Sequence, residues 1–300
     1  MEKITLASQL LQYLITGLTV GSVYAMVAVG FNIIYNVTEI INFAQGEFVM
    51  LGGLIMVSLH VAMGLPLILA FPGTIVLVTV IGILIDRLAI RHIRRPTVFT
   101  LIIATIAVSI IIKGMASFIW GKDPFDLPAF SGRNPINILG AVIQPQYFWA
   151  IGFLVITVIA LSIFFDRTII GKAMSACADN SNAASLVGIN VKQMVLLSFA
   201  LSAAIGAVAG ITITPISLME YDRGAMLAVK GFGAAILGGL GSFPGAILGG
   251  LIIGSIESFG AGLIHSGYKD AFALIVLLVI LFFKPSGLLG SIEISRIKRF

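Results

Sequence analysis

The chain has 300 residues, of which 59% are apolar and only 10% are charged, and its mean hydropathy is +1.11. A soluble domain typically carries about 25% charged residues, so this composition excludes a water-solvated globule and requires the lipid bilayer as solvent. At roughly 20 residues per span, the length allows about 8–10 spans and leaves no room for a separate soluble domain. We therefore predict an all-α polytopic membrane protein that forms a single transmembrane domain over 1–300.

Nine apolar stretches follow one another along the chain. Several of them are short or interrupted by glycine, so we predict eight or nine transmembrane helices, with one broken or re-entrant segment. The stretches are 9–35, 43–62, 66–85, 98–119, 146–165, 193–215, 225–241, 244–259 and 270–283.

The basic residues lie in three groups at the ends of apolar stretches, which is the pattern of cytoplasmic loops. This placement between spans also argues against nucleic acid as the partner of a chain with net charge +5. Loops 86–97 and 166–192 and the tail from 284 are then cytoplasmic, and loop 120–145 is external. The groups are Arg87, Arg91, Arg94 and Arg95; Arg167, Lys172 and Lys192; and Lys284, Arg296, Lys298 and Arg299.

The segment 36–53, NVTEIINFAQGEFVMLGG, opens a helix with polar residues. Asn42 followed three residues later by Gln45 resembles a capping box. Glu47 then falls in the first turns, where the positive end of the helix dipole favours a carboxylate. This is a sufficient structural account. The functional alternative is that Asn42, Gln45, Gly46 and Glu47 line the translocation path.

The predicted cytoplasmic loop 166–192 is long and rich in Ala, Ser and Asn. Its pattern predicts two short helical turns, the second capped near Asn180 and ended by Gly188. A long loop in a chain of short loops is usually functional. We expect its small helices to dock in a groove on a cytosolic partner, and the alternative is an ordinary surface loop.

The segment 231–254 holds nine glycines in 24 residues. Ser242 and Pro244 suit the first turn of a helix, and the glycines before them break the chain. One interpretation is close helix packing through small residues. The other is that the broken helix borders the solute path, because unwound backbone at membrane depth is tolerated only against protein or a wet cavity. The path candidates here are Gly238, Gly239, Gly241 and Ser242.

Three further ionisable residues lie within apolar stretches: Lys113, Lys230 and Glu257. A charge at bilayer depth costs at least about 2.5–3.5 kcal/mol, so each should face the protein interior or reach an interface. Glu257 is a candidate partner for Lys230. The single cysteine and three scattered histidines indicate neither a metal site nor a catalytic cluster, and the chain has no Walker A sequence. We expect no enzyme activity and no cofactor on this chain.

Taken together, four segments resemble the permease subunits of bacterial branched-chain amino acid ABC transporters, of the LivH type. They are 17–47 (GLTVGSVYAMVAVGFNIIYNVTEIINFAQGE), 171–191 (GKAMSACADNSNAASLVGINV), 234–254 (AAILGGLGSFPGAILGGLIIG) and 284–290 (KPSGLLG). The resemblance implies import of leucine, isoleucine and valine across the bacterial plasma (inner) membrane. It also implies a second homologous permease subunit, two cytosolic ABC ATPase subunits that hold ATP and Mg, and a periplasmic or lipid-anchored solute-binding protein.

The resemblance assigns roles to two sets of residues. The first set matches the family signature after the first span and consists of Asn42, Phe43, Gln45, Gly46 and Glu47. The second set is the implied ATPase-coupling segment and consists of Gly171, Lys172, Ala178, Asp179, Asn180, Ala183, Gly188 and Ile189.

Other functions remain open at this point. Related permeases carry urea, short amides or other amino acids with similar patterns. A stand-alone channel or secondary carrier is a rival from another class, although such a carrier has no ATPase for the long loop 166–192 to engage. A membrane-embedded enzyme would need clustered His, Asp or Ser groups in its spans, which the sequence lacks.

Overall fold

A computed structural model describes residues 6–93, 97–132, 134–284 and 286–290. Of the basic groups named above, Arg94, Arg95, Arg296, Lys298 and Arg299 lie outside the described residues. The described part is almost entirely helical, as predicted. Its elements are α1 (Leu6–Thr38), α2 (Gln45–Val57), the π-helix η1 (Ser58–Ala62), α3 (Leu67–Ile85), the π-helix η2 (Asp86–Ile90), α4 (Val98–Trp120), β1 (Ile136–Ile138), β2 (Ala141–Ile143), α5 (Pro145–Arg167), α6 (Ile169–Leu186), α7 (Val191–Ser217), α8 (Arg223–Gly238), α9 (Phe243–Leu263), the 3-10 helix η3 (Ser266–Tyr268) and α10 (Lys269–Phe283).

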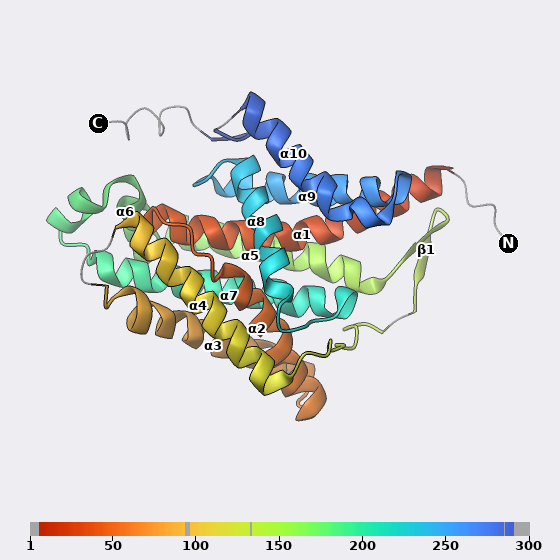
Figure 1. The fold of residues 1–300 in the computed structure, drawn as a ribbon, viewed down its shortest axis with the longest axis horizontal. Helices are drawn as coiled ribbons and strands as arrows, with labels where there is room; N and C mark the ends of the chain where they lie inside the picture. Colours follow the sequence, from red (N-terminus) through yellow and green to blue (C-terminus); the bar gives the residue numbers. More distant parts are fainter. Residues whose placement is uncertain (1–5, 94–96, 133, 285, 291–300) are drawn as a thin grey trace.

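The helix α1 lies at the centre of a bundle. It packs against α7, α8 and α9, and it is buried almost continuously from Gly21 to Ile34. Figure 1 shows α1, α7 and α9 along the long axis, with α6 at one end of the molecule and the β1–β2 hairpin at the other. We call these the α6 end and the hairpin end. The helix α1 begins at the hairpin end. The predicted external loop 120–145 contains the hairpin, and the predicted cytoplasmic loop 166–192 contains α6. The two loops therefore lie at opposite ends of the molecule, as the pattern of basic residues predicted.

Eight helices of the described residues are long and apolar enough to cross a membrane. The helix α8 is not among them: its 16 residues span only about 24 Å at 1.5 Å per residue, less than the roughly 30 Å of a bilayer core. The eight candidate spans agree with the prediction of eight or nine transmembrane helices. The ninth apolar stretch, 225–241, forms the short helix α8.

Glycines allow the central backbones to touch. A Cβ atom at Gly254 of α9 would collide with the backbone of Gly21 in α1, and one at Gly245 would collide with the carbonyl of Gly238 at the end of α8. Close packing through small residues replaces the hydrophobic effect as the force that joins helices in lipid. The glycine-rich segment therefore packs closely, as one of its two interpretations predicted.

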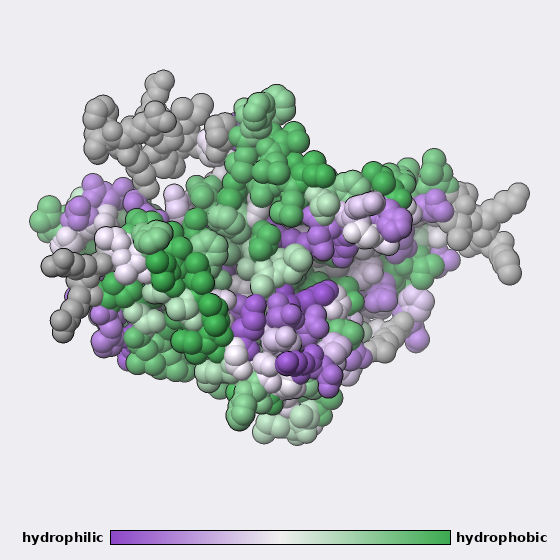
Figure 2. Space-filling model, viewed as in Figure 1, coloured by the Kyte–Doolittle hydropathy of each residue, from purple (hydrophilic) through white to green (hydrophobic). Residues whose placement is uncertain are grey.

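The outer surface divides into apolar and polar areas. Apolar residues cover α4 and α10 on the face shown in Figure 2, whereas hydrophilic residues gather over the start of α8. The chain leading into α8 includes Glu220, whose carboxylate lies 3.7 Å from the guanidinium of Arg223. A polar area thus reaches the middle of a face that is otherwise suited to lipid or to a protein partner.

Candidate functional site

Two helices begin inside the bundle rather than at its ends. The helix α2 follows the non-helical residues 39–44, and α8 follows the non-helical residues 218–222. Their first turns meet at Gly46 and Gly224: a Cβ atom at Gly224 would lie 2.5 Å from the carbonyl oxygen of Gly46, and one at Gly46 would collide with the Gly224 carbonyl. Helix N-termini carry free N–H groups and partial positive charge. The structure therefore brings two such ends together.

The predicted capping box at the start of α2 is wrong. The Oδ1 atom of Asn42 accepts from the backbone N–H of Ala44 at 3.1 Å rather than from Gln45. The side chain of Gln45 does not reach back to Asn42, because it bonds to Ser202 of α7: the Ser202 hydroxyl donates to Gln45 Oε1 at 2.5 Å. Gln45, fully buried, fastens α2 to α7.

The carboxylate of Glu47 is buried, with 1% of the residue exposed, and is only half satisfied. The hydroxyl of Ser109 donates to Glu47 Oε1 at 2.8 Å, whereas Oε2 has no hydrogen-bond partner. The amide nitrogen Nδ2 of Asn42, also fully buried, has none either. Within the described part of the chain these are the two buried side-chain polar atoms left without a partner. Such atoms are rare, and each requires an explanation.

The helix α4 lies parallel to α2 and in register with it. Three hydrogen bonds join the two segments, and in each the partners are 62 positions apart in the sequence. The bonds run from Phe43 N to Thr105 Oγ1 (3.2 Å), from Ser109 Oγ to Glu47 Oε1 (2.8 Å) and from Trp120 Nε1 to Ser58 Oγ (2.7 Å). This polar seam attaches α4 to α2, while most of the remaining surface of α4 is apolar and exposed.

The second predicted group of path residues lies in a joint between α8 and α9. Gly239 and Gly241 have φ values of +105° and +90°, which favour glycine, and Ser242 caps α9 through the N–H of Gly245 at 3.1 Å. Two asparagines of α1 satisfy the joint: Asn32 donates to the Ser242 carbonyl at 2.9 Å, and Asn36 to the Gly241 carbonyl at 3.1 Å. These polar groups already have partners within the chain.

The structure separates the two predicted groups. Gly224, at the first group, and Gly238, at the second, stand at opposite ends of α8, about 21 Å apart at 1.5 Å per residue. Both unpartnered polar atoms found in the described part of the chain belong to the first group. We therefore take the meeting point of α2 and α8 as the candidate site.

A buried charge cluster holds α8 against its neighbours. Lys230 of α8 lies 2.9 Å from Glu257 of α9, which confirms the pairing considered from the sequence. The sequence interpretation missed three further members: Asp270 lies 2.6 Å from Lys230, Lys269 lies 3.1 Å from Glu257, and the hydroxyl of Tyr24 donates to Glu257 at 2.9 Å. The adjacent charges of Lys269 and Asp270 at the start of an apolar stretch were the available signal. Every charge in the cluster has an opposite partner.

The segment 166–192 contains one kinked helix, α6 (Ile169–Leu186), in agreement with the prediction of two short helical pieces. The backbone of Asn180 is non-helical (φ −159°, ψ +102°), and its side chain accepts from the N–H of Ala183 at 2.9 Å, which caps the second piece. Gly188 follows with φ +91°, where L side chains are strained, and ends the segment. The first piece is capped by Thr168, whose hydroxyl accepts from the N–H of Gly171 at 2.9 Å.

The predicted coupling residues divide by exposure. Gly171 is buried against the end of α5, where a Cβ atom would meet the backbone of Phe164 and Phe165. Lys172, Asp179, Asn180, Ala183 and Gly188 are exposed, whereas Ala178 and Ile189 are half-buried. Next to them Leu186 and Val187 are 88% and 78% exposed. The α6 end thus presents small and apolar side chains outward, on a helix anchored by the buried residues Met174, Cys177 and Ala184.

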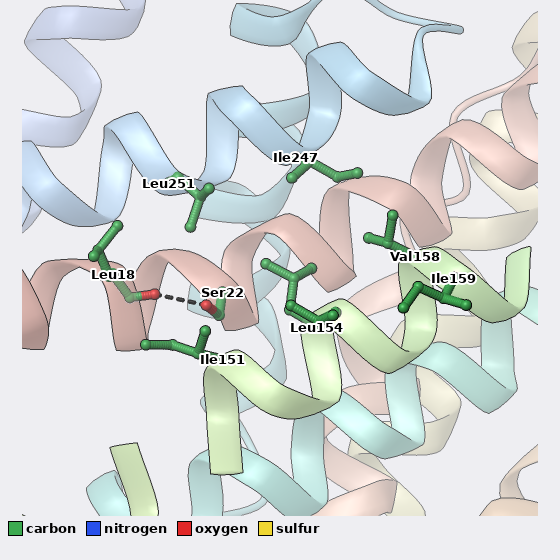
Figure 3. Close-up of a pocket in the computed structure, with 9 residues that line it drawn as sticks. Leu18, Ser22, Ile151, Leu154, Val158, Ile159, Ile247 and Leu251 are labelled. Atoms are coloured by element: carbon green, nitrogen blue, oxygen red, sulfur yellow. Dashed lines mark hydrogen bonds between the residues drawn. The ribbon is translucent and has the colours of Figure 1, made fainter. Parts of the chain in front are cut away.

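An apolar groove lies between α1, α5 and α9. Figure 3 shows its lining of Leu, Ile and Val side chains. The volume of the groove is about 320 Å³. Its single polar side chain, Ser22, donates to the carbonyl of Leu18 at 2.7 Å and so offers nothing further to a ligand as a donor. The groove suits a hydrocarbon chain and does not suit a zwitterion.

Comparison with known proteins places these features in a family context. Residues 13–281 match the family model described as "Branched-chain amino acid transport system / permease component". The chain is 34% identical to the high-affinity branched-chain amino acid transport system permease protein BraD of Pseudomonas aeruginosa, over 96% of this chain and 98% of that protein. It is 33% identical to LivH of Escherichia coli K12, over 96% and 97%. It is 28% identical to the ribose import permease protein RbsC of Haemophilus influenzae, over 87% and 81%.

Proposed function

The chain belongs to the branched-chain amino acid transport system permease family, and from that premise we propose that it imports leucine, isoleucine and valine across the inner membrane of a bacterium. It is a multi-pass membrane permease subunit of an importer. In the proposed assembly it pairs with a second homologous permease, two cytosolic ATPase subunits hydrolyse ATP, and a solute-binding protein delivers the solute from outside.

The observation that carries this proposal is the position of the two buried side chains that, among the described residues, keep a polar atom without a hydrogen-bond partner. Asn42 and Glu47 lie where α2 and α8 begin, within a bundle whose exposed helical faces are largely apolar. An amino acid is a zwitterion and needs donors and acceptors along its path. The apolar groove lined by Leu18 and Leu154 does not supply them.

The proposed coupling to ATP hydrolysis depends on α6. The exposed side chains of Ala183, Leu186 and Val187 fit a groove on a cytosolic ATPase, and the anchored residues of α6 transmit its movement to the bundle. At this end, α6 approaches the start of the α2 segment: Ser181 and Ile40 line the same groove of about 460 Å³. Closure of the ATPase pair is thereby linked to the residues that lead into α2.

The test uses the complete transporter, with the second permease, the ATPase pair and the binding protein, reconstituted in proteoliposomes. Ala183→Arg places bulk and charge on the proposed docking surface. It should abolish leucine uptake and solute-stimulated ATP hydrolysis while the chain still inserts and assembles with the second permease. Ala183→Ser, which keeps a small side chain at the same position, should retain both activities. Normal coupling in Ala183→Arg would remove α6 from the ATPase interface.

The rival function, a stand-alone channel or carrier, makes a different prediction. The tagged chain purified from native membranes would then come without ATPase subunits and would move solute in liposomes on its own. A permease subunit brings its ATPases with it and moves no solute alone.

A further inference from the structure

The two unpartnered polar atoms are of opposite character. Glu47 Oε2 is an anionic acceptor, and Asn42 Nδ2 is a donor. Both belong to one six-residue segment, and both residues are at least 99% buried. A lone unsatisfied atom could reflect a local packing fault, but a donor and an acceptor on the same short segment match the two ends of one small molecule.

The surroundings of this pair contain further charges and helix ends. Glu47 lies in the first turn of α2, near the positive end of the helix dipole. The positive end of α8 lies against it, since a Cβ atom at Gly224 would be 3.1 Å from Glu47 Oε2. Lys113 and Asp222 are close enough to act on Glu47 electrostatically, yet among the described residues Glu47 forms no ion pair. The carboxylate is left with one oxygen free to accept from a cation.

We propose that Asn42 and Glu47 hold the α-amino and α-carboxyl groups of the transported amino acid during its passage. The ammonium group of the solute donates to Glu47 Oε2. The carboxylate of the solute accepts from Asn42 Nδ2. This inference rests on the proposed function and adds which part of the solute the site recognises. The site binds the zwitterion common to all α-amino acids and not the side chain. Neutral urea and sugars lack both charges.

The site is closed in this structure. Both residues are buried, and Gly46 and Gly224 touch backbone to backbone above the carboxylate. Solute enters when α2 and α8 move apart. The polar seam gives α2 a partner that can move with it, since Ser109 of α4 holds the other oxygen of Glu47.

The test compares two variants of Glu47 and one control variant in the complete reconstituted transporter. Glu47→Gln keeps the size and the hydrogen bond from Ser109 but removes the charge. Glu47→Asp keeps the charge but shortens the side chain and fits less well. If the carboxylate holds an ammonium group, leucine uptake should decrease about tenfold or more in Glu47→Gln, with Glu47→Asp intermediate. Glu220→Gln, the same change on the exposed chain before α8, is the matched control and should stay within about twofold of the unmodified transporter.

The order of the variants separates charge recognition from packing. A packing role predicts that Glu47→Gln transports nearly as well as the unmodified protein and that Glu47→Asp is the poorer variant, which would overturn the proposal. Thermal unfolding gives a second measurement: Glu47→Gln removes a half-satisfied buried charge, so its midpoint should not decrease. A large decrease would assign Glu47 a structural role instead.

The donor side is tested by Asn42→Asp. The substitution preserves an acceptor for the Ala44 N–H but replaces the amide donor with a carboxylate, which repels the carboxylate of the solute. Uptake should decrease about tenfold or more, and unchanged uptake would contradict the assignment. Failure of the unmodified transporter to import any amino acid would overturn the proposed function itself. Import by the unmodified transporter that Glu47→Gln leaves unchanged would overturn only this inference.

Discussion

The contact between α2 and α8 can be tested by adding a single methyl group at Gly224. A Cβ atom there would lie 2.5 Å from the carbonyl oxygen of Gly46 and 2.9 Å from its carbonyl carbon. Both are backbone atoms, so no side chain can rotate away to make room. For the oxygen to reach ordinary contact at about 3.4 Å, the two helices must separate by roughly 0.9 Å. Gly224→Ala therefore forces apart the helices that enclose the proposed site.

Two opposing effects set the size of the loss. Overpacking a well-packed interior costs about 1–3 kcal/mol. Alanine favours a helix over glycine by about 1 kcal/mol, which offsets part of this cost. The net destabilisation expected for Gly224→Ala is then about 0–2 kcal/mol. The control is a glycine-to-alanine change that has the same gain in helix propensity but no collision. Gly114 of α4 is such a position. A Cβ atom at Gly114 would meet nothing within 4 Å.

The assay is thermal unfolding of the two variants in the same detergent, together with leucine uptake by the reconstituted transporter. Gly114→Ala should be neutral or stabilising by up to about 1 kcal/mol, and it should transport normally. Gly224→Ala should be less stable than Gly114→Ala by about 1–3 kcal/mol, and its uptake should be reduced. Equal stability of the two variants would refute the close approach of α2 and α8, and with it the closed state of the site.

Three further outcomes are expected. Ser242→Ala should lower stability by about 1 kcal/mol through loss of the cap on α9, measured by thermal unfolding. Lys230→Met removes one of the two cations beside the buried Glu257, and Lys269 remains 3.1 Å from it, so the variant should lose about 1–3 kcal/mol of stability, measured by thermal unfolding. Burial raises the pKa of the Cys177 thiol, so its reactive thiolate forms only at higher pH than that of an exposed cysteine. Maleimide should therefore label Cys177 slowly at neutral pH and faster as the pH rises. An exposed cysteine introduced as Ala183→Cys, in a chain that also carries Cys177→Ala, should label readily.

The local features of the fold were predictable because their signals lie within a few residues. Ser242 and Pro244 begin a helix, as expected, because a serine cap and a proline in the first turn act on their immediate neighbours. The kinked helix α6 follows in the same way from Asn180 as a cap and Gly188 as a terminator. The number of spans followed from hydropathy, which lipid imposes on every exposed helical surface.

The capping box shows why other features could not be predicted. The spacing of Asn42 and Gln45 fits the motif, but Ser202 lies 157 positions from Gln45 and offers a better partner in the folded chain. No local pattern reports a residue so distant. The charge cluster is similar. Lys230 and Glu257 could be considered as partners because both are charges within apolar stretches, whereas Tyr24 joins from 233 positions away and carries no charge that would draw attention to it.

The meeting of α2 and α8 could be predicted from the sequence only in part. Each glycine alone is unremarkable in a chain with 33 of them, and only the fold reveals that Gly46 and Gly224 touch across 178 positions. Yet the polar residues beside Gly46 were conspicuous from the sequence, because Asn42 and Glu47 interrupt an apolar context. Helix packing alone does not explain them, since an apolar or small residue would pack there without leaving buried polar atoms unsatisfied. The cost of those atoms in the closed state is offset when a donor reaches Glu47 Oε2 and an acceptor reaches Asn42 Nδ2, and an amino acid carries both.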